Sequence, residues 1–284
     1  TGDTGEWVFD AGGNLTGFTD LGTGGAGFTA LLTGDFDGSG NNEVLWEDAA
    51  SGDTGYWTIA HGTVTGFHDF GVAANPDYTA VAVGDFTGGG ADQVLWEDAS
   101  TGDTGYWTTN AQGVVTGFFD LGAASTSYSV VGVGDFDGSG HDEVLWENNA
   151  TGDTGYWTTN ASGALVGFVD LGQGAANYSV VGVGDFDDSG RDEVLWEDKA
   201  TGDIGYWTTN ASGQVTGFHD FGFADTTYDV VGVGDYDNSG HDEVLWENPA
   251  TGDIGYWTTN ANGAVTGFHD LGAADTSFHI VPSH

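Results

Sequence analysis

The sequence is almost devoid of basic residues. It has 284 residues with 44 Asp and Glu but only two Lys and Arg, which are Arg191 and Lys199, so its formal net charge is −42. Such a surface repels phosphate backbones and anionic headgroups, so neither nucleic acid nor a membrane surface is an expected partner. Adaptation to high salt, a bias of exported proteins and the binding of divalent cations would all explain the acidity. The net charge alone does not distinguish among these three explanations.

Cysteine and methionine are absent. Without cysteine there are no disulfides and no thiolate metal ligands, which excludes a small disulfide-stapled domain. Because the first residue is Thr1 and not Met, we expect a processed product or an excerpt from which any export signal has been removed. No apolar run approaches the ~20 residues of a membrane-spanning helix, so we expect no direct membrane insertion.

The residues that are present form a repeat of 50 positions. The segment Gly2 to Trp7 (GDTGEW) returns near-identically every 50 residues, and so does Gly-Asp-Phe or Gly-Asp-Tyr from Gly34 onward. No insertion breaks the period. The chain is therefore predicted to be one array and a single domain, residues 1–284, without linkers.

One period, residues 128–177, predicts four strands. The β-rich stretches 128–136, 143–147, 154–160 and 164–171 are separated by turns rich in Gly, Asn and Asp. No helical periodicity is present. Four antiparallel strands in each ~50 residues are typical of propeller blades, so the sequence predicts an all-β fold, a β-propeller of four-stranded antiparallel blades. A β-solenoid, the main rival, has shorter rungs.

The number of blades follows from the register. Five full units leave residues 1–27, which align with the third and fourth strands, and residues 278–284, which align with the first strand. Both ends are expected to form a partial sixth blade that lacks its second strand. The predicted full units are 28–77, 78–127, 128–177, 178–227 and 228–277.

A metal-binding loop is predicted between the first and second strands. In the third unit, positions one, three and five bring the side-chain oxygens of Asp135, Asp137 and Ser139 inward, and the carbonyl of His141 is available at position seven. Glu143 closes the cage at position nine. Hard oxygen ligands without a nitrogen or sulfur donor favour Ca²⁺ over zinc or copper.

Four units carry the intact pattern, so we predict about four Ca²⁺ sites. Their predicted ligands are Asp35, Asp37, Ser39, Asn41, Glu43; Asp135, Asp137, Ser139, His141, Glu143; Asp185, Asp187, Ser189, Arg191, Glu193; and Asp235, Asp237, Ser239, His241, Glu243. Asn41, His141, Arg191 and His241 would bind through their backbone carbonyls.

The loop of the second unit is degraded. Asp85 remains, but Thr87, Gly89 and Gln93 replace the other side-chain ligands, so a weak or empty site is expected there.

A single Asp-Gly-Ser-Gly run is also compatible with a metal-free turn. Four copies in register favour calcium, because without a cation each loop gathers three carboxylates, or four with Asp142, Asp192 or Asp242 nearby, and almost no base to neutralise them. The hydroxyl at position five replaces a stronger ligand. The expected affinity is therefore that of extracellular modules, about 10⁻⁴ to 10⁻³ M.

The segment Gly134 to Leu145 (GDFDGSGHDEVL) and its copies resemble the FG-GAP or VCBS repeats of bacterial exported proteins and of integrin α-subunit propellers. The resemblance covers the five full units and implies calcium in the strand-connecting loops and adhesion as a function. Ser at position five and Glu at position nine depart from the family pattern of Asp or Asn and Asp. The resemblance therefore supports the first two aspartates of each loop as ligands more directly than it supports the four glutamates at position nine.

Two other readings concern the tryptophans and catalysis. The Trp pairs, such as Trp146 with Trp157, suit sugar stacking or packing between blades, and their strand positions favour packing. No Cys nucleophile, His-Glu-x-x-His motif or phosphate loop is present. A glycosidase-type carboxylate pair is compatible with the composition, but near-identical units argue against an active site. We therefore expect no enzymatic activity.

These observations lead to three hypotheses. The first is a secreted, calcium-stabilised, non-enzymatic propeller for adhesion or recognition of a protein or glycan at a bacterial cell surface. In the second, the incomplete blade pairs with another subunit, including a second copy, to build an assembly. The third is a non-catalytic propeller of a longer secreted enzyme.

Overall fold

The fold consists of β-strands only. The computed structural model describes residues 3–10, 12–60, 62–72, 76–110, 113–160, 163–260, 263–278 and 280–281. Over these residues there are five four-stranded antiparallel sheets and one two-stranded sheet, as predicted. The described residues include no helix, and so none long and apolar enough to cross a membrane.

The strands follow the 50-residue period. The terminal pair is β1 (Asp3–Phe9) and β2 (Leu15–Thr23). Blade 1 is β3 (Phe28–Gly34), β4 (Glu43–Asp48), β5 (Asp53–Ala60) and β6 (Thr63–Val72); blade 2 is β7 (Thr79–Gly84), β8 (Gln93–Asp98), β9 (Asp103–Thr109) and β10 (Val115–Ala123). Blade 3 is β11 (Tyr128–Gly134), β12 (Glu143–Asn148), β13 (Asp153–Thr159) and β14 (Leu165–Gln173). Blade 4 is β15 (Ser179–Gly184), β16 (Glu193–Asp198), β17 (Asp203–Thr209) and β18 (Val215–Phe223); blade 5 is β19 (Asp229–Gly234), β20 (Glu243–Asn248), β21 (Asp253–Thr259) and β22 (Val265–Ala273).

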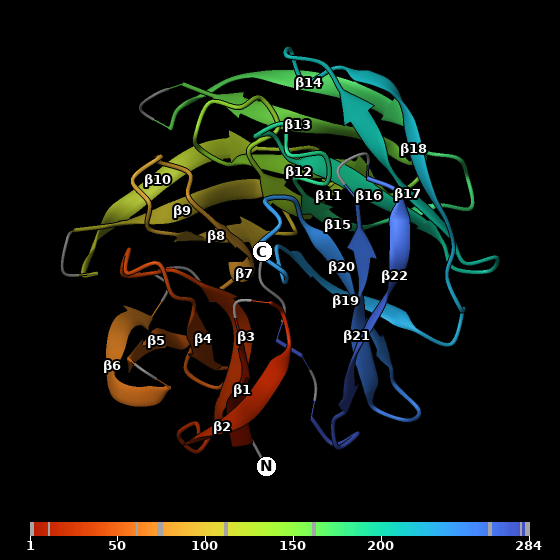
Figure 1. The fold of residues 1–284 in the computed structure, drawn as a ribbon. Coiled ribbons are helices and arrows are strands. Elements are labelled where there is room, and N and C mark those ends of the chain that lie inside the picture. Colours follow the sequence, from red (N-terminus) through yellow and green to blue (C-terminus); the bar gives the residue numbers. More distant parts are fainter. Residues whose placement is uncertain are drawn as a thin grey trace.

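The blades are arranged around an axis with the first strand of each innermost (Figure 1). Contacts between neighbouring blades run from β3 to β7, β11, β15 and β19 in turn. Each sheet is thus a simple meander whose strands pair in chain order. Consecutive antiparallel strands place the connections alternately on two faces of the ring, so all loops between first and second strands lie on one face.

The terminal pair occupies the sixth position of the ring. On one side, Gly24 approaches the Trp46 ring of blade 1. On the other, Leu15 packs against the core of blade 5, and the Tyr256 hydroxyl donates a hydrogen bond of 3.4 Å to the Gly13 carbonyl. Of the predicted first strand of this blade, Phe278, Ile280 and Val281 are described, and none is part of a strand; residues 279 and 282–284 lie outside the described residues.

The core lies between the blades. In the second strand of blade 3, Val144, Leu145 and Trp146 are all buried, because both faces of the sheet are covered by neighbouring blades. The five tryptophans at the position of Trp146 are 1–2% exposed, and each packs on the tryptophan of the third strand, with ring centroids 4.7 Å apart for Trp146 and Trp157. Their prediction as packing residues is confirmed.

Candidate metal centres

The predicted loops join the first and second strands of each blade. Their fourth and sixth positions have positive φ, for example 72° at Gly138 and 84° at Gly140. In blades 4 and 5 the fourth position is Asp188 (φ 56°) or Asn238 (φ 58°), the residue types that tolerate this region without being glycine. The local sequence thus turns the chain back so that alternate side chains point inward.

Four loops bring three carboxylates together. In each of them one carboxylate oxygen from positions one, three and nine lies within 4.8 Å of the others. The clusters are Asp35, Asp37, Glu43; Asp135, Asp137, Glu143; Asp185, Asp187, Glu193; and Asp235, Asp237, Glu243. These are the four loops that the sequence pattern indicated.

The aspartate at position one is held by the backbone of its own loop. In blade 3 the Asp135 carboxylate accepts hydrogen bonds from the amides of Ser139 at 2.9 Å and Gly140 at 2.8 Å. The equivalent pair of bonds is present in blades 1, 4 and 5. The loop is therefore preorganised around this carboxylate before any cation enters.

The glutamate at position nine is fully buried. Glu43 and Glu143 are 0% exposed, and Glu193 and Glu243 are 1% exposed. One oxygen of each accepts a hydrogen bond from the amide of position two, as from Phe36 to Glu43 at 3.0 Å. A buried carboxylate needs partners for its remaining lone pairs.

Several of these partners are missing within the protein. Glu43 Oε1, Glu193 Oε1, Asp137 Oδ1 and Asp237 Oδ1 are buried and have no hydrogen-bond partner. An unpaired buried carboxylate oxygen carries a large desolvation cost, and a cation placed among the three carboxylates would remove it. The orphaned oxygens are therefore evidence, independent of the sequence pattern, that the clusters hold a positive ion.

Electrostatics supports the same conclusion. Burial, together with the neighbouring Asp37 or Asp237 charge, raises the pKa of Glu43 and Glu243 to about 7. The same two causes raise the pKa of Glu143 and Glu193 to about 9. Without a cation the glutamate must retain a proton to relieve the repulsion, whereas a divalent ion would displace that proton.

The hydroxyl and carbonyl ligands are placed less uniformly. In blade 5 Ser239 Oγ lies 3.2 Å from Glu243 Oε1 and 3.3 Å from the His241 carbonyl, and blade 3 has the same arrangement. In blade 4 Ser189 Oγ is buried without a partner. In blade 1 the Ser39 hydroxyl accepts from Asn41. The four position-seven carbonyls, those of Asn41, His141, Arg191 and His241, therefore all stay predicted ligands.

The loop of blade 2 has no carboxylate cluster among the described residues. Asp85 accepts hydrogen bonds from the Thr87 hydroxyl and from the amides of Gly89 and Gly90, and Gln93 donates to the Ala91 carbonyl. Neutral groups thus replace the mutually repelling carboxylates of the other loops, which agrees with the predicted degraded site, although Gln93 Oε1 is itself buried without a hydrogen-bond partner.

The aspartates at position eight have a role that sequence reasoning missed. They were expected as a fourth carboxylate of their own loop, but Asp192 Oδ2 accepts a hydrogen bond of 2.8 Å from the Asp135 amide of the preceding blade, and the Asp192 amide donates to the Asp135 carbonyl at 3.0 Å. The same reciprocal pair links Asp35 with Asp92, Asp85 with Asp142, and Asp185 with Asp242. We call these four pairs the inter-blade clamps.

The sequence held a signal for the clamps. Asp92 is retained in blade 2 although the ligands around it have been replaced, and a residue kept after its metal site has decayed must serve something else. Each clamp joins the position-one aspartate of one loop to the loop of the next blade. The candidate metal loops are thereby linked in series around one face of the ring.

No protein-family model and no curated protein sequence matches the chain. Solved structures match its fold at low identity. The nidogen/laminin complex matches with 13% identity and a TM-score of 0.59, covering 95% of this chain and 90% of that one. An Agrocybe aegerita lectin described as recognising non-reducing terminal N-acetylglucosamine matches with 11% identity and a TM-score of 0.54, covering 96% and 94%.

A Photorhabdus luminescens Tc holotoxin pore matches with 13% identity and a TM-score of 0.55; 90% of this chain is covered, but it spans only 14% of the toxin chain. Agrobacterium tumefaciens regucalcin, described as calcium-binding, matches with 13% identity and a TM-score of 0.50, covering 86% and 76%. At such identities these likenesses establish the β-propeller fold and nothing more specific.

The same comparison corrects one prediction. A quinonprotein alcohol dehydrogenase-like protein from Bacteroides thetaiotaomicron matches with 12% identity and a TM-score of 0.47, covering 96% of this chain and 64% of that one. A dihydro-heme d1 dehydrogenase matches with 9% identity and a TM-score of 0.39, covering 82% of this chain and 45% of that one. The prediction that the chain is not an enzyme is therefore wrong as an inference from a repetitive propeller, because proteins with this architecture include enzymes.

Proposed function

We propose that the chain is a secreted, calcium-stabilised recognition propeller of the FG-GAP or VCBS type. The observation that carries the calcium part is the set of buried, unpartnered carboxylate oxygens in loops that gather three carboxylates each. Oxygen-only donors on a tight loop suit Ca²⁺, which accepts irregular geometry more readily than Mg²⁺. The calcium-binding description of regucalcin lends general support for a propeller as a calcium host.

Calorimetric titration of the chelated protein with Ca²⁺ tests this proposal. We expect four sites and a rise in melting temperature on saturation. Glu193→Gln should lower the stoichiometry to three, because it removes the buried charge of one cluster. Gln93→Glu serves as the matched control, since it adds a carboxylate to a loop that still lacks one at position three. A melting temperature that ignores calcium would overturn the proposal.

Recognition at a bacterial cell surface is the second part of the proposal. It is supported by propellers of similar fold that are described as recognising N-acetylglucosamine and as part of a laminin complex. The acidic surface restricts the partner to a protein or glycan that is neutral or basic. Binding to bacterial cells and to a glycan array, measured with calcium and after chelation, tests this part. Absence of any binding in calcium would count against it.

A specific observation also favours assembly as an alternative function. In the described residues β1 pairs only with β2, whereas the equivalent β5, β9, β13, β17 and β21 pair on both sides. A strand edge of this kind is a template for a further strand. Light scattering of the protein over a range of concentrations tests the alternative. A monomer at every concentration would exclude self-assembly through this edge.

A further inference from the structure

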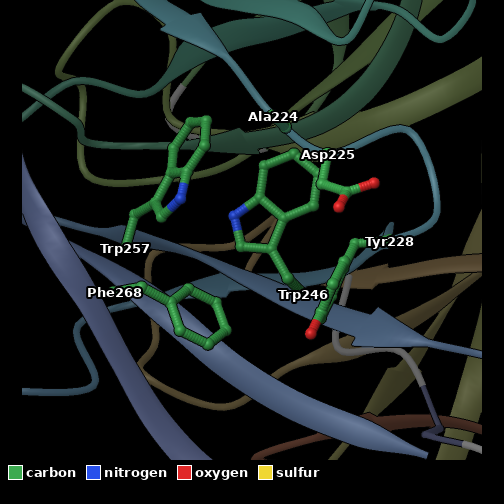
Figure 2. A pocket seen from close by; sticks show the side chains of 6 residues that line it. All are labelled: Ala224, Asp225, Tyr228, Trp246, Trp257 and Phe268. Atoms are coloured by element: carbon green, nitrogen blue, oxygen red, sulfur yellow. The ribbon is translucent and has the colours of Figure 1, made fainter. Parts of the chain in front are cut away.

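Aromatic clefts lie on the face of the ring opposite to the metal loops. One is lined by Ala224, Asp225, Tyr228, Trp246, Trp257 and Phe268, with a volume of about 210 Å³ (Figure 2). A second, of about 280 Å³, has the equivalent residues one blade earlier, including Tyr178, Trp196, Trp207 and Phe218. We call the first the blade 5 cleft and the second the blade 4 cleft. Each is smaller than a drug-sized pocket, so each suits a ligand of few atoms.

The walls of the blade 5 cleft are four aromatic rings. Trp246 and Trp257 have centroids 4.8 Å apart with planes inclined by 52°, and Tyr228 meets Phe268 edge to face at 6.0 Å. Figure 2 shows the Trp246 ring between Tyr228 and Trp257, with Phe268 closing the lower side. Phe268 is 43% exposed, so the cleft is open to solvent on that side.

A carboxylate stands at the rim of this cleft. Asp225 Oδ1 accepts hydrogen bonds from the Thr227 amide at 3.0 Å and the Thr227 hydroxyl at 2.9 Å, which lower the pKa of Asp225 and keep it ionised. The Tyr228 hydroxyl donates to Asp253. That bond and the charges of Asp253 and Asp225 contribute to a pKa of about 12 for Tyr228. The potential around the rings is therefore strongly negative.

The one neighbouring base does not cancel this potential. Lys199 Nζ lies 2.7 Å from Asp229 and 3.9 Å from Glu197, and it also donates to the Tyr228 carbonyl. Its charge is matched by these two carboxylates. Asp225 and Asp253 are left as the net charge beside the rings.

Trp246 is only 1% exposed, so the rings that a ligand can reach are those of Tyr228, Trp257 and Phe268, with a carboxylate at the rim. A cleft of this kind has a specific chemical preference. Ring faces carry negative quadrupole charge and attract cations, most effectively those that are weakly hydrated, such as quaternary ammonium groups. An anionic ligand would be repelled by a chain of net charge −42, and a neutral ligand would gain only a hydrogen bond from Asp225, without the charge attraction that a cation gains. The charge and shape of the cleft complement a compact organic cation.

We propose that the blade 5 cleft binds a small soluble quaternary ammonium compound of the choline type. This ligand site goes beyond the calcium and surface recognition functions proposed above. It lies on the other face of the ring from the metal loops, so it does not depend on their occupancy.

The chain contains its own matched control. The blade 4 cleft has the same four aromatic residues, but Ala175 stands where Asp225 stands in blade 5. The connecting turn is conserved, because the Tyr178 amide donates to the Ala175 carbonyl at 2.8 Å and the Tyr228 amide donates to the Asp225 carbonyl at 3.0 Å. The two clefts therefore share their rings and their turn, and they differ in the rim carboxylate, in Gln173, which lines only the blade 4 cleft, and in Lys199, which contacts Tyr228 beside the blade 5 cleft.

Calorimetric titration of the calcium-loaded protein with choline chloride tests the proposal, with 3,3-dimethylbutan-1-ol as the neutral analogue of the same shape. We expect one choline site and binding of the neutral analogue weaker by about 5-fold or more. Asp225→Asn should weaken choline binding about 5-fold while keeping the Oδ1 acceptor for Thr227. Ala175→Asp should create a second choline site.

Three outcomes would contradict choline binding in the blade 5 cleft. Equal affinity for choline and its neutral analogue, or full choline affinity in Asp225→Asn, would overturn the proposal. Saturable binding of N-acetylglucosamine with no binding of choline would also overturn it and make the cleft a sugar site. Calcium stoichiometry is measured on the same samples. A normal value shows that the variants are folded and that a negative choline result leaves the calcium proposal standing.

Discussion

At the scale of single residues, the buried glutamates determine how the metal loops respond to protons. Glu193 shows the conflict most clearly, since it is 1% exposed, one of its oxygens has no partner and two aspartates of its own loop face it. Glu193 can stay buried in this fold only if its carboxyl group is protonated or a cation lies beside it. Blade 2 avoids the conflict because Gln93 is neutral.

This conflict predicts an inverted pH dependence for the chelated protein. The pKa of the four glutamates in the fold, about 7 for Glu43 and Glu243 and about 9 for Glu143 and Glu193, exceeds their ordinary value of 4.5. Folding therefore gains proton-linked stability that is complete below pH 4.5 and is lost as the pH rises through 7 and 9. The melting temperature of the chelated protein should fall between pH 5 and pH 9.

Calcium should remove this dependence, because the bound ion replaces the proton. The gain in melting temperature on adding calcium is thus expected to grow from pH 5 to pH 9. Glu193→Gln provides the control, since the chelated variant should lose part of the pH slope. Parallel profiles with and without calcium would contradict the prediction.

At the scale of elements, the inter-blade clamps join residues that are 57 positions apart in sequence and lie in the loops of neighbouring blades. A clamp uses the backbone of a ligand residue and not its carboxylate, so it supports the loop without joining the metal site. The backbone of Asp135, for example, is bonded to Asp192 while its carboxylate faces its own loop.

Removing one clamp should cost stability but no metal site. Asp192→Ala deletes the acceptor of the Asp135 amide, and the expected cost is about 1–3 kcal/mol. The calcium stoichiometry should stay at four. Asp188→Asn is the charge-matched control, because Asp188 is exposed and blade 5 has Asn238 at the same position. Chemical denaturation and calorimetry measure both quantities, and a stoichiometry of three for Asp192→Ala would identify Asp192 as a ligand.

A second feature at this scale is the pairing of glycine with phenylalanine on the outer strands. A Cβ on Gly105 would lie 2.5 Å from Phe118 Cζ and 2.3 Å from the Phe119 carbonyl oxygen, so β9 has room there only for glycine. The ring of Phe118 covers the backbone at Gly105, which would otherwise be open to solvent, as aromatic residues commonly do beside strand glycines.

Gly105→Ala is therefore expected to destabilise the protein by about 1–3 kcal/mol through overpacking. Gly117→Ala in the neighbouring β10 is the matched control, because its Cβ would meet nothing closer than Thr108 Oγ1 at 3.5 Å. The two variants are compared by urea denaturation. Equal stability of both would show that β9 can shift to accept a side chain.

At the scale of the whole molecule, the excess of acidic residues opposes compaction. Four calcium ions would add only eight positive charges to a formal net charge of −42. Self-repulsion therefore persists in the calcium-loaded protein, and salt is the remaining means of reducing it.

Sodium chloride should raise the melting temperature of the chelated protein by a few degrees between 0.01 M and 1 M, because the screening length falls from about 30 Å to about 3 Å. The calcium-loaded protein should gain less, since its densest carboxylate clusters are already neutralised. Scanning fluorimetry with and without a chelator measures the difference. A chelated protein that is insensitive to salt would show that long-range repulsion contributes little to its stability.

The sequence by itself determined the repeat, the four strands of each blade and the four carboxylate loops, because each of these depends on residues close together in the chain. Turn glycines, alternating strand residues and the one-three-nine spacing of ligands act within about ten positions, and the structure reproduces them.

Only the tertiary structure decided what depends on neighbours a whole blade apart. It turned Asp142 and its equivalents from expected partners of their own loop into inter-blade clamps, buried the tryptophans and formed the aromatic cleft beside Asp225. The strand positions of the tryptophans and the retained Asp92 indicate packing in the sequence but not the partners, since a side chain in one 50-residue unit acquires its partner only when the next blade packs against it.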